Sequence, residues 1–238
     1  MQIVPLPVFE EDADPSRRDA LTLEEQLEKL EAPETIVVKF GALKLIGEYK
    51  QAGGIKAGCG SKLVARTHRG TELVEMLTTT CSNSGCGKSI SRQQMLEYIE
   101  NSGGKNFPFY TNGRVLRIAT TDDLSRMDKL RGRIDEQIRS SRVMVEEHRL
   151  TMKIVDVEPV LGEELLTFYY LSEDRVDFRS LVSDLASKYS TRIEMRQVGA
   201  RDEARLVADY EKCGQHCCCK SFLKVLSPVS MRTAKQQK

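Results

Sequence analysis

The chain has 238 residues and nearly balanced charge, with 36 Lys and Arg against 35 Asp and Glu and a net charge of +1. Its hydrophobic fraction of 40% is that of a globular protein, and its length allows one large core or two small ones. The charge balance gives no global field that would attract nucleic acid, and the lack of ~18 consecutive apolar residues excludes a membrane span.

Residues 1–33 are predicted to be a polar N-terminal extension with one short charged helix, TLEEQLEKLE. The start of the chain has neither the basic residues nor the apolar core of a signal peptide. We therefore expect a cytoplasmic protein. In that reducing compartment, clustered cysteines favour metal ligation or redox chemistry over structural disulfides.

Residues 34–80 are predicted to form a small antiparallel β-sheet or barrel. Four short runs rich in β-branched residues are separated by glycines, and Arg69-Gly70 is placed for a tight hairpin. The four runs are TIVVKF, ALKLIGEY, KLVART and ELVEML.

Residues 81–113 are predicted to be a Cys-bearing insertion with one short helix, SRQQMLEYIENS. Ser91 and Gln94 suit a capping box, and Gly103-Gly104 suits the end of the helix. The insertion opens with CSNSGCGKS, whose Gly87-Lys88-Ser89 resembles the end of a P-loop. Ser82 occupies the position where that motif needs glycine, which argues against a nucleotide site.

Residues 114–200 show the clearest pattern, with the order β-α-β-β-α-β. The strand GRVLRIAT leads to one long helix from Asp122 to about His148, whose apolar residues recur at three- and four-residue steps. The strands TMKIVDVE and LLTFYYL, a second helix capped by Asp177 and the strand TRIEMRQV follow. We predict an α+β protein, with the small antiparallel β domain followed by a ferredoxin-like β-α-β-β-α-β unit and a Cys-rich C-terminal segment at 201–238.

Four of the seven cysteines lie within CGQHCCC, as Cys213, Cys217, Cys218 and Cys219. Thiolates are soft ligands that suit zinc, copper(I) and iron–sulfur clusters, and a spacing of three or four residues can place two sulfurs on one ion. Successive side chains diverge, so we expect Cys213 with one or two of the other three to ligate. The alternative is that these cysteines are small buried hydrophobic residues. Cys59, between two glycines, is expected to be incidental.

The second half of the chain resembles a known family. The stretches RVDFRSLVSDLAS, RIEMRQVGARDEAR and the Cys-Gly-x-x-x-Cys-Cys element at Cys213–Cys219 are similar to the bacterial YaaT-like (RicT) stage 0 sporulation family with a polymerase-suppressor C-terminal domain. SKLVARTHRGTELVEML and RVLRIATTDDLSRM resemble its earlier segments. The likeness covers about residues 34–80 and 114–237.

This resemblance implies a non-enzymatic cytoplasmic adaptor. The family's members join small helical partner proteins in a complex that adjusts RNA processing and carries iron–sulfur clusters, so protein partners and an indirect or weak contact with RNA are expected. Within this element, Cys213, Gly214, Cys218 and Cys219 match the positions that the family pattern fixes. Gln215 and Cys217 differ from the family pattern, and the family's second Cys-Gly-x-x-x-Cys-Cys element is not in this sequence. We hypothesise that Cys81 and Cys86 supply the missing thiolates of a metal site. The site would hold either a 4Fe-4S cluster, within this chain or shared with a partner, or zinc.

Two other functions remain open. One is a zinc-stabilised four-cysteine module that contacts protein or nucleic acid, and the other is a thiol-redox protein. The basic residues of RQVGARDEAR and RMDKLRGRIDEQIRSSR could meet phosphates, but interleaved acids favour a solvated surface. No combination of nucleophile, base and oxyanion donors is evident, so an enzyme is not expected.

Overall fold

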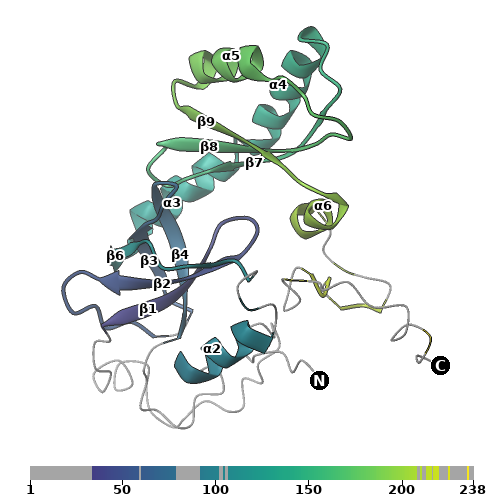
Figure 1. Ribbon diagram of the computed structural model, residues 1–238. Coiled ribbons are helices and arrows are strands. Elements are labelled where there is room, and N and C mark those ends of the chain that lie inside the picture. Colours follow the sequence, from purple (N-terminus) through teal and green to yellow (C-terminus); the bar gives the residue numbers. More distant parts are fainter. Residues whose placement is uncertain are drawn as a thin grey trace.

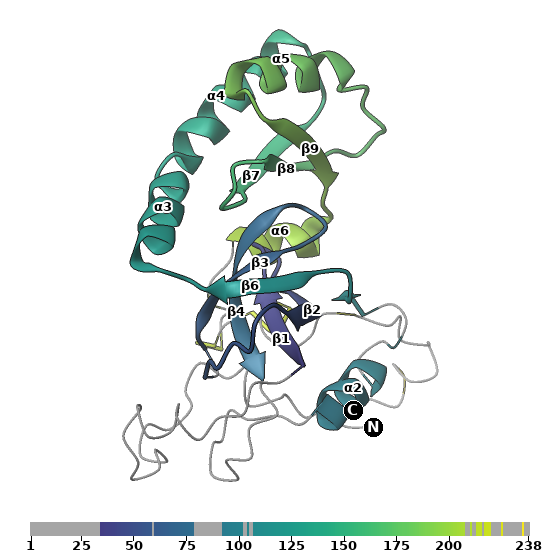
Figure 2. The ribbon, with the colours of Figure 1, turned by 90° about the vertical axis from the view of Figure 1, so that its left-hand side faces the viewer.

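The computed structural model shows two folded units joined by a pair of helices (Figures 1 and 2). None of the helices in the part of the chain that it describes is long and apolar enough to cross a membrane. The structure describes residues 34–58, 60–78, 92–101, 104, 107–207, 210, 213–215, 217–219, 225 and 235. The extension at 1–33, with its expected helix, lies outside these residues.

The first unit is a small closed barrel. Strand β1 pairs antiparallel with β2 on one side and β4 on the other, and β3 and β6 complete the ring from β4 back to β2. A barrel is therefore found where a small antiparallel sheet or barrel was predicted at 34–80, but it closes only with β6, which lies outside that range and pairs parallel with β2. Its strands are β1 (Thr35–Phe40), β2 (Leu45–Gln51), β3 (Lys62–Arg66), β4 (Thr71–Thr78) and β6 (Arg114–Ile118), with the short β5 (Phe109–Tyr110) along β2 before β6.

The two-residue period of these strands fills both faces of the barrel wall. Ile36, Val38 and Phe40 of β1 point into the barrel core, whereas Val37 packs with Met95 of helix α2 (Arg92–Asn101). Helix α2, predicted from SRQQMLEYIENS, thus covers one outer face of the barrel, as Figure 1 shows. Ser91 of its expected capping box lies outside the described residues.

The second unit is a three-stranded sheet, β7 (Lys153–Pro159), β8 (Leu165–Leu171) and β9 (Arg192–Gln197). Strands β7 and β8 are antiparallel, and β9 lies parallel to β8 after the crossover helix α5 (Arg179–Tyr189). Almost every residue of LLTFYYL is buried, because helices cover one face of β8 and the barrel lies against the other. Helix α6 (Ala200–Val207) follows β9.

The predicted ferredoxin-like arrangement is not found among the described residues. The elements occur in the expected order, but the first strand, β6, belongs to the barrel, where it pairs with β2 and β3. In a ferredoxin-like sheet that strand would separate the last two strands of the unit. With β6 in the barrel, β8 and β9 pair directly and in parallel. The mixed α+β class is confirmed, and its finer arrangement is corrected.

The long predicted helix is two helices, α3 (Thr121–Arg131) and α4 (Ile134–Glu147). A capping box between Thr120 and Asp123 starts α3, and a tight turn at Gly132, a poor helix former, separates it from α4. Met127 of α3 packs on the barrel, whereas Val145 of α4 packs on the second sheet. Figure 2 shows α3 and α4 following one another between the barrel and the second sheet, and the break between them lets their apolar residues pack on two different surfaces.

Candidate functional site at the junction of the two units

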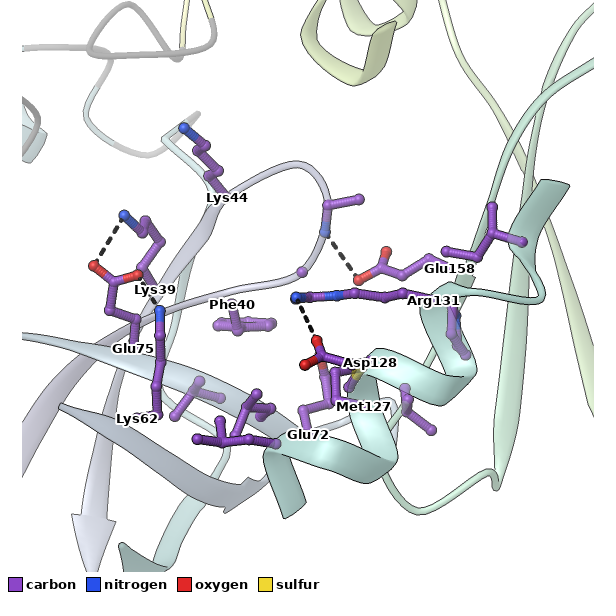
Figure 3. Close-up of a pocket in the computed structure, with 18 of the residues that line it drawn as sticks. Lys39, Phe40, Lys44, Lys62, Glu72, Glu75, Met127, Asp128, Arg131 and Glu158 are labelled. Atoms are coloured by element: carbon purple, nitrogen blue, oxygen red, sulfur yellow. Dashed lines mark hydrogen bonds and ion pairs between the residues drawn. The ribbon is translucent and has the colours of Figure 1, made fainter. Parts of the chain in front are cut away.

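A pocket of about 560 Å³ lies where the barrel, helix α3 and strand β7 meet (Figure 3). Its floor is apolar and its rim is charged. On the barrel side Glu75 forms ion pairs with Lys62 at 2.7 Å and with Lys39 at 3.4 Å. On α3, Arg131 lies 3.9 Å from Asp128. The apolar lining includes Phe40, Leu73, Val74, Leu124, Met127, Ile134, Val157 and Val160.

A buried ion network forms the base of this junction. Arg69, in the hairpin between β3 and β4, donates two hydrogen bonds to Glu158 of β7, from Nη1 at 2.7 Å and Nη2 at 2.8 Å. The same guanidinium bonds both oxygens of Glu72, with Nε to Oε1 at 3.0 Å. The Arg69 side chain is only 3% exposed. The bidentate geometry therefore fastens the barrel to the second sheet through a desolvated charge pair.

Further groups converge on the Glu158 carboxylate from both units. The backbone N–H of Ala42, in the turn between β1 and β2, donates to Oε1 at 2.9 Å, and the hydroxyl of Tyr169 donates to Oε2 at 2.5 Å. Thr67 bonds Glu72 in turn. Every member of the network thus has polar partners, as a buried charge requires.

The charges of this network reinforce one another. Burial alone would raise the pKa of Glu158, but the hydrogen bonds and charge of Arg69 outweigh it and lower that pKa below its ordinary value. Burial lowers the pKa of Arg69, and its two carboxylates more than compensate, so that pKa is raised. Burial and the Glu158 charge raise the pKa of Tyr169, which therefore stays a hydrogen-bond donor.

Gly41 leaves the space that the network needs. Its φ of +74° is a conformation that favours glycine, and an added Cβ would lie 2.8 Å from Nη2 of Arg69 and 3.2 Å from Oε1 of Glu158. Any side chain at this turn would therefore both strain the backbone and displace the ion pair.

The pocket also holds Asp156, a carboxyl whose pKa is raised. Burial raises the pKa of Asp156, the Val157 amide that donates to it opposes this effect, and the charges of Glu158 and Asp135 raise it further. The lining of this pocket within the described chain contains no Ser, Thr, Cys, His or Tyr. Among the same described residues, its charged groups are carboxylates, lysines and one arginine.

The cysteines predicted as ligands are only partly described. Cys213 and Cys218 are exposed, Cys219 is half-buried and Cys217 is fully buried. Thiolates suit a soft metal or cluster, yet across the described ranges no group of three or more His, Cys, Asp or Glu residues could hold a metal ion. The described cysteines therefore do not by themselves make a closed ligand set. Cys81 and Cys86 lie outside the described residues, so the predicted site stays a prediction.

Sequence reasoning missed the two residues that fasten the junction. Arg69 was expected only in a tight hairpin, which the structure confirms with a Thr67 N–H to Gly70 carbonyl bond of 2.8 Å, and Glu158 was expected only within a strand. Strand β7, KIVDVEP, also carries Lys153 and Asp156, so no signal in its sequence singles out Glu158.

His148 is a second missed contact. Its Nε2 lies 2.8 Å from Asp184 and its Nδ1 lies 3.3 Å from the hydroxyl of Ser180, so it links α4 to α5. The three residue types are those of a hydrolase triad, but the ring nitrogens are used in the opposite order and Ser180 is exposed on a helix. We interpret the group as a clamp between two helices.

Comparison with known proteins gives matches over part of the chain. Residues 113–198 match the PSP1 C-terminal conserved region. The chain is 41% identical over 124 residues to the stage 0 sporulation protein YaaT of Bacillus subtilis (strain 168), a stretch that is 52% of this chain and 45% of that protein. It is 33% identical over 82 residues to an uncharacterized protein of Schizosaccharomyces pombe, covering 34% of this chain and 11% of the other. The chain therefore spans less than half the length of these curated relatives. No solved structure matches it.

Replacing Arg69 should destabilise the protein more than replacing Glu158. Arg69→Met leaves two buried carboxylates without their cation, whereas Glu158→Gln leaves the Arg69–Glu72 pair intact. We expect a loss of about 3–5 kcal/mol for Arg69→Met. For Glu158→Gln we expect about 1–3 kcal/mol. Urea unfolding of both variants measures the difference, and the reverse order would contradict this account.

Proposed function

Starting from its membership in the YaaT-like family of proteins that carry the PSP1 C-terminal conserved region, we propose that the chain is a non-enzymatic regulatory adaptor. The observation that carries the proposal is the junction pocket, where elements from both units present fixed ion pairs around an apolar floor. Such a surface, with charged groups around an apolar centre, suits a protein partner. The process it serves, as the family resemblance implies, is the regulation of RNA processing in the cytoplasm.

The rigidity of the junction supports an adaptor role. The Arg69–Glu158 pair and two further contacts between the units, from the N–H of Thr71 to Glu164 at 2.8 Å and from Arg126 to Glu163 at 2.7 Å, hold the pocket walls in one arrangement. A surface that is already in its binding geometry loses less entropy when a partner docks.

The adaptor proposal is tested with two exposed apolar residues on neighbouring helices. Leu124 of α3 lines the pocket and is 37% exposed, whereas Val143 of α4 is 53% exposed and lies outside it. We expect Leu124→Arg to reduce recovery of the natural partner proteins at least about tenfold, as a loss of ~1.4 kcal/mol would. Val143→Arg should recover them as the wild type does.

The measurement is quantitative mass spectrometry of proteins that co-purify with the full chain from the cells that naturally make it. Thermal unfolding of each variant controls for loss of fold. Recovery that is unchanged in Leu124→Arg, or reduced equally in Val143→Arg, would rule out the junction pocket as the partner surface.

The second part of the proposal is an iron–sulfur cluster held by thiolates. Cys213 with Cys217, Cys218 or Cys219 would provide ligands, and Cys81 with Cys86, or a partner chain, would complete the set. The soft donor chemistry and the Cys-Gly-x-x-x-Cys-Cys element support this assignment. Zinc in a four-cysteine site is the alternative, because closed tetrahedral thiolate sites are common structural sites.

Anaerobic purification of the full chain, followed by an absorption spectrum and analysis for iron, sulfide and zinc, tests the cluster. We expect a broad band near ~400 nm with iron and sulfide. Both should be lost in Cys213→Ser/Cys218→Ser, reduced in Cys81→Ser/Cys86→Ser and unchanged in the control Cys59→Ser. If the chain instead contains about one zinc and no iron, the four-cysteine zinc site is correct and the cluster is not. A metal-free chain, alone and in its complex, would exclude both.

A further inference from the structure

A second cavity, of about 620 Å³, lies at the start of helix α6 and is separate from the junction pocket. Figure 1 shows α6 below the strands of the second sheet, on the side of the barrel. One wall of the cavity is formed by the end of β9 and the first turns of α6. The rest of the lining is apolar, with Leu43, Leu45, Pro108 and Val225.

Three arginines line this cavity, Arg196 of β9 and Arg201 and Arg205 of α6. Arg205 is paired with Asp202 at 3.1 Å. In the described part of the chain, neither Arg196 nor Arg201 is paired with a carboxylate. Two uncompensated guanidinium groups in a concave site concentrate anions there, and their planar geometry matches that of phosphate oxygens.

The acidic residues interleaved with these arginines do not cancel them. Asp202 is occupied by Arg205, and Glu203 lies 3.6 Å from Lys153 of β7. Within GARDEAR, Asp202 therefore pairs with Arg205 of the same stretch and Glu203 with Lys153 of β7, whereas Arg201 lines the cavity. The sequence favoured a solvated surface for this stretch, and the structure agrees for the Asp202–Arg205 pair but leaves Arg201 without a carboxylate partner among the residues that it describes.

The first turn of α6 adds donors to the same wall. Gly199, Ala200, Arg201 and Asp202 all line the cavity, and the carbonyl of Gly199 accepts the first helical hydrogen bond, from Glu203, at 2.9 Å. The N–H groups of a first turn have no partner within their helix and carry the positive end of its dipole. The space beside Gly199 is open, with no heavy atom within 4 Å of an added Cβ.

We infer that this cavity binds a phosphate monoester, with the phosphate on Arg196, Arg201 and the N-terminus of α6 and the organic group against Leu43, Leu45 and Pro108. Guanidinium forks and helix N-termini are both recurrent means by which proteins hold such dianions. A volume of about 620 Å³ exceeds what a bare phosphate needs and lies in the range of small-molecule sites. The site is independent of the proposed adaptor function, and its test has no bearing on the junction pocket.

The test is isothermal titration of the full chain with inorganic phosphate and with phenyl phosphate at constant ionic strength. Both should bind saturably at one site, and phenyl phosphate should bind several-fold more tightly because its ring meets the apolar wall. Equal or weaker binding of phenyl phosphate would overturn the assignment of a monoester. Lack of saturable binding by either would overturn the site.

Matched variants separate the site from a general effect of charge. Arg196→Gln and Arg201→Gln should each weaken phenyl phosphate binding about tenfold, the effect of removing one charge-assisted hydrogen-bonding group. Arg192→Gln removes the same charge from an exposed position of the same strand, outside the cavity, and should leave binding unchanged. An equal loss in all three variants would contradict the inference.

A third variant does not depend on weakening the fold. Gly199→Asp places a carboxylate at the start of α6, where Asp is a preferred cap and where the structure has open space. The variant should unfold at the same or a higher temperature than the wild type, yet lose phosphate binding because its own carboxylate occupies the donors. Undiminished binding in this variant would place the anion elsewhere.

Discussion

The contact on which the arrangement depends is the buried pair between Arg69 and Glu158. It joins a hairpin of the barrel to a strand of the second sheet, residues 89 apart in sequence, and it is almost completely removed from water. A desolvated charge is tolerated only when its partners are fixed, so this pair demands one relative position of the two units. Ala42 and Tyr169 donate to Glu158, Glu72 accepts the other N–H donors of Arg69, and Thr67 donates to Glu72. Gly41 leaves room for this network. The walls of the pocket beside the pair are therefore held in a fixed relative position.

The stretch that matches the PSP1 C-terminal conserved region does not stand apart from the rest of the chain. It starts at residue 113, and its first strand, β6, closes the barrel that the preceding strands begin. It also contains Glu158, whose partner Arg69 lies before it, and Tyr169, which donates to Glu158. The two units therefore share a strand connection, a buried ion network and one continuous core that includes Val155 and Tyr169 with the barrel residues. A rigid two-unit scaffold of this kind is what a regulatory adaptor needs to present two surfaces in a set relation.

Local sequence predicted the elements well and their partners poorly. The periodicities of TIVVKF, KLVART and LLTFYYL identified β1, β3 and β8, because a two-residue or continuous apolar pattern reports burial directly. GRVLRIAT was correctly a strand, but its pattern suits either sheet, and only contacts distant in sequence place it in the barrel. Gly132 interrupts the long helix because α3 and α4 pack on different units, a fact that the helix sequence does not contain. Arg69 and Glu158 were missed for the same reason. Each becomes part of a buried ion pair only through contact with the other, and neither local sequence contains that contact. The predicted cysteine ligands remain a prediction.

The most direct test of the account is the pH dependence of unfolding in the wild type and in Glu158→Gln. The pKa of Glu158 is lowered in the folded protein from an ordinary value of 4.5. Its carboxylate therefore stabilises the fold fully above that value, and this contribution is lost as the pH falls from about 4.5 through the folded pKa. Glu75, Glu164 and Asp123 also have lowered pKa values and lose stability in acid in both proteins. The account predicts a steeper loss of unfolding free energy in the wild type below pH 4.5 than in Glu158→Gln. Parallel curves would show that the Arg69–Glu158 pair does not hold the two units together.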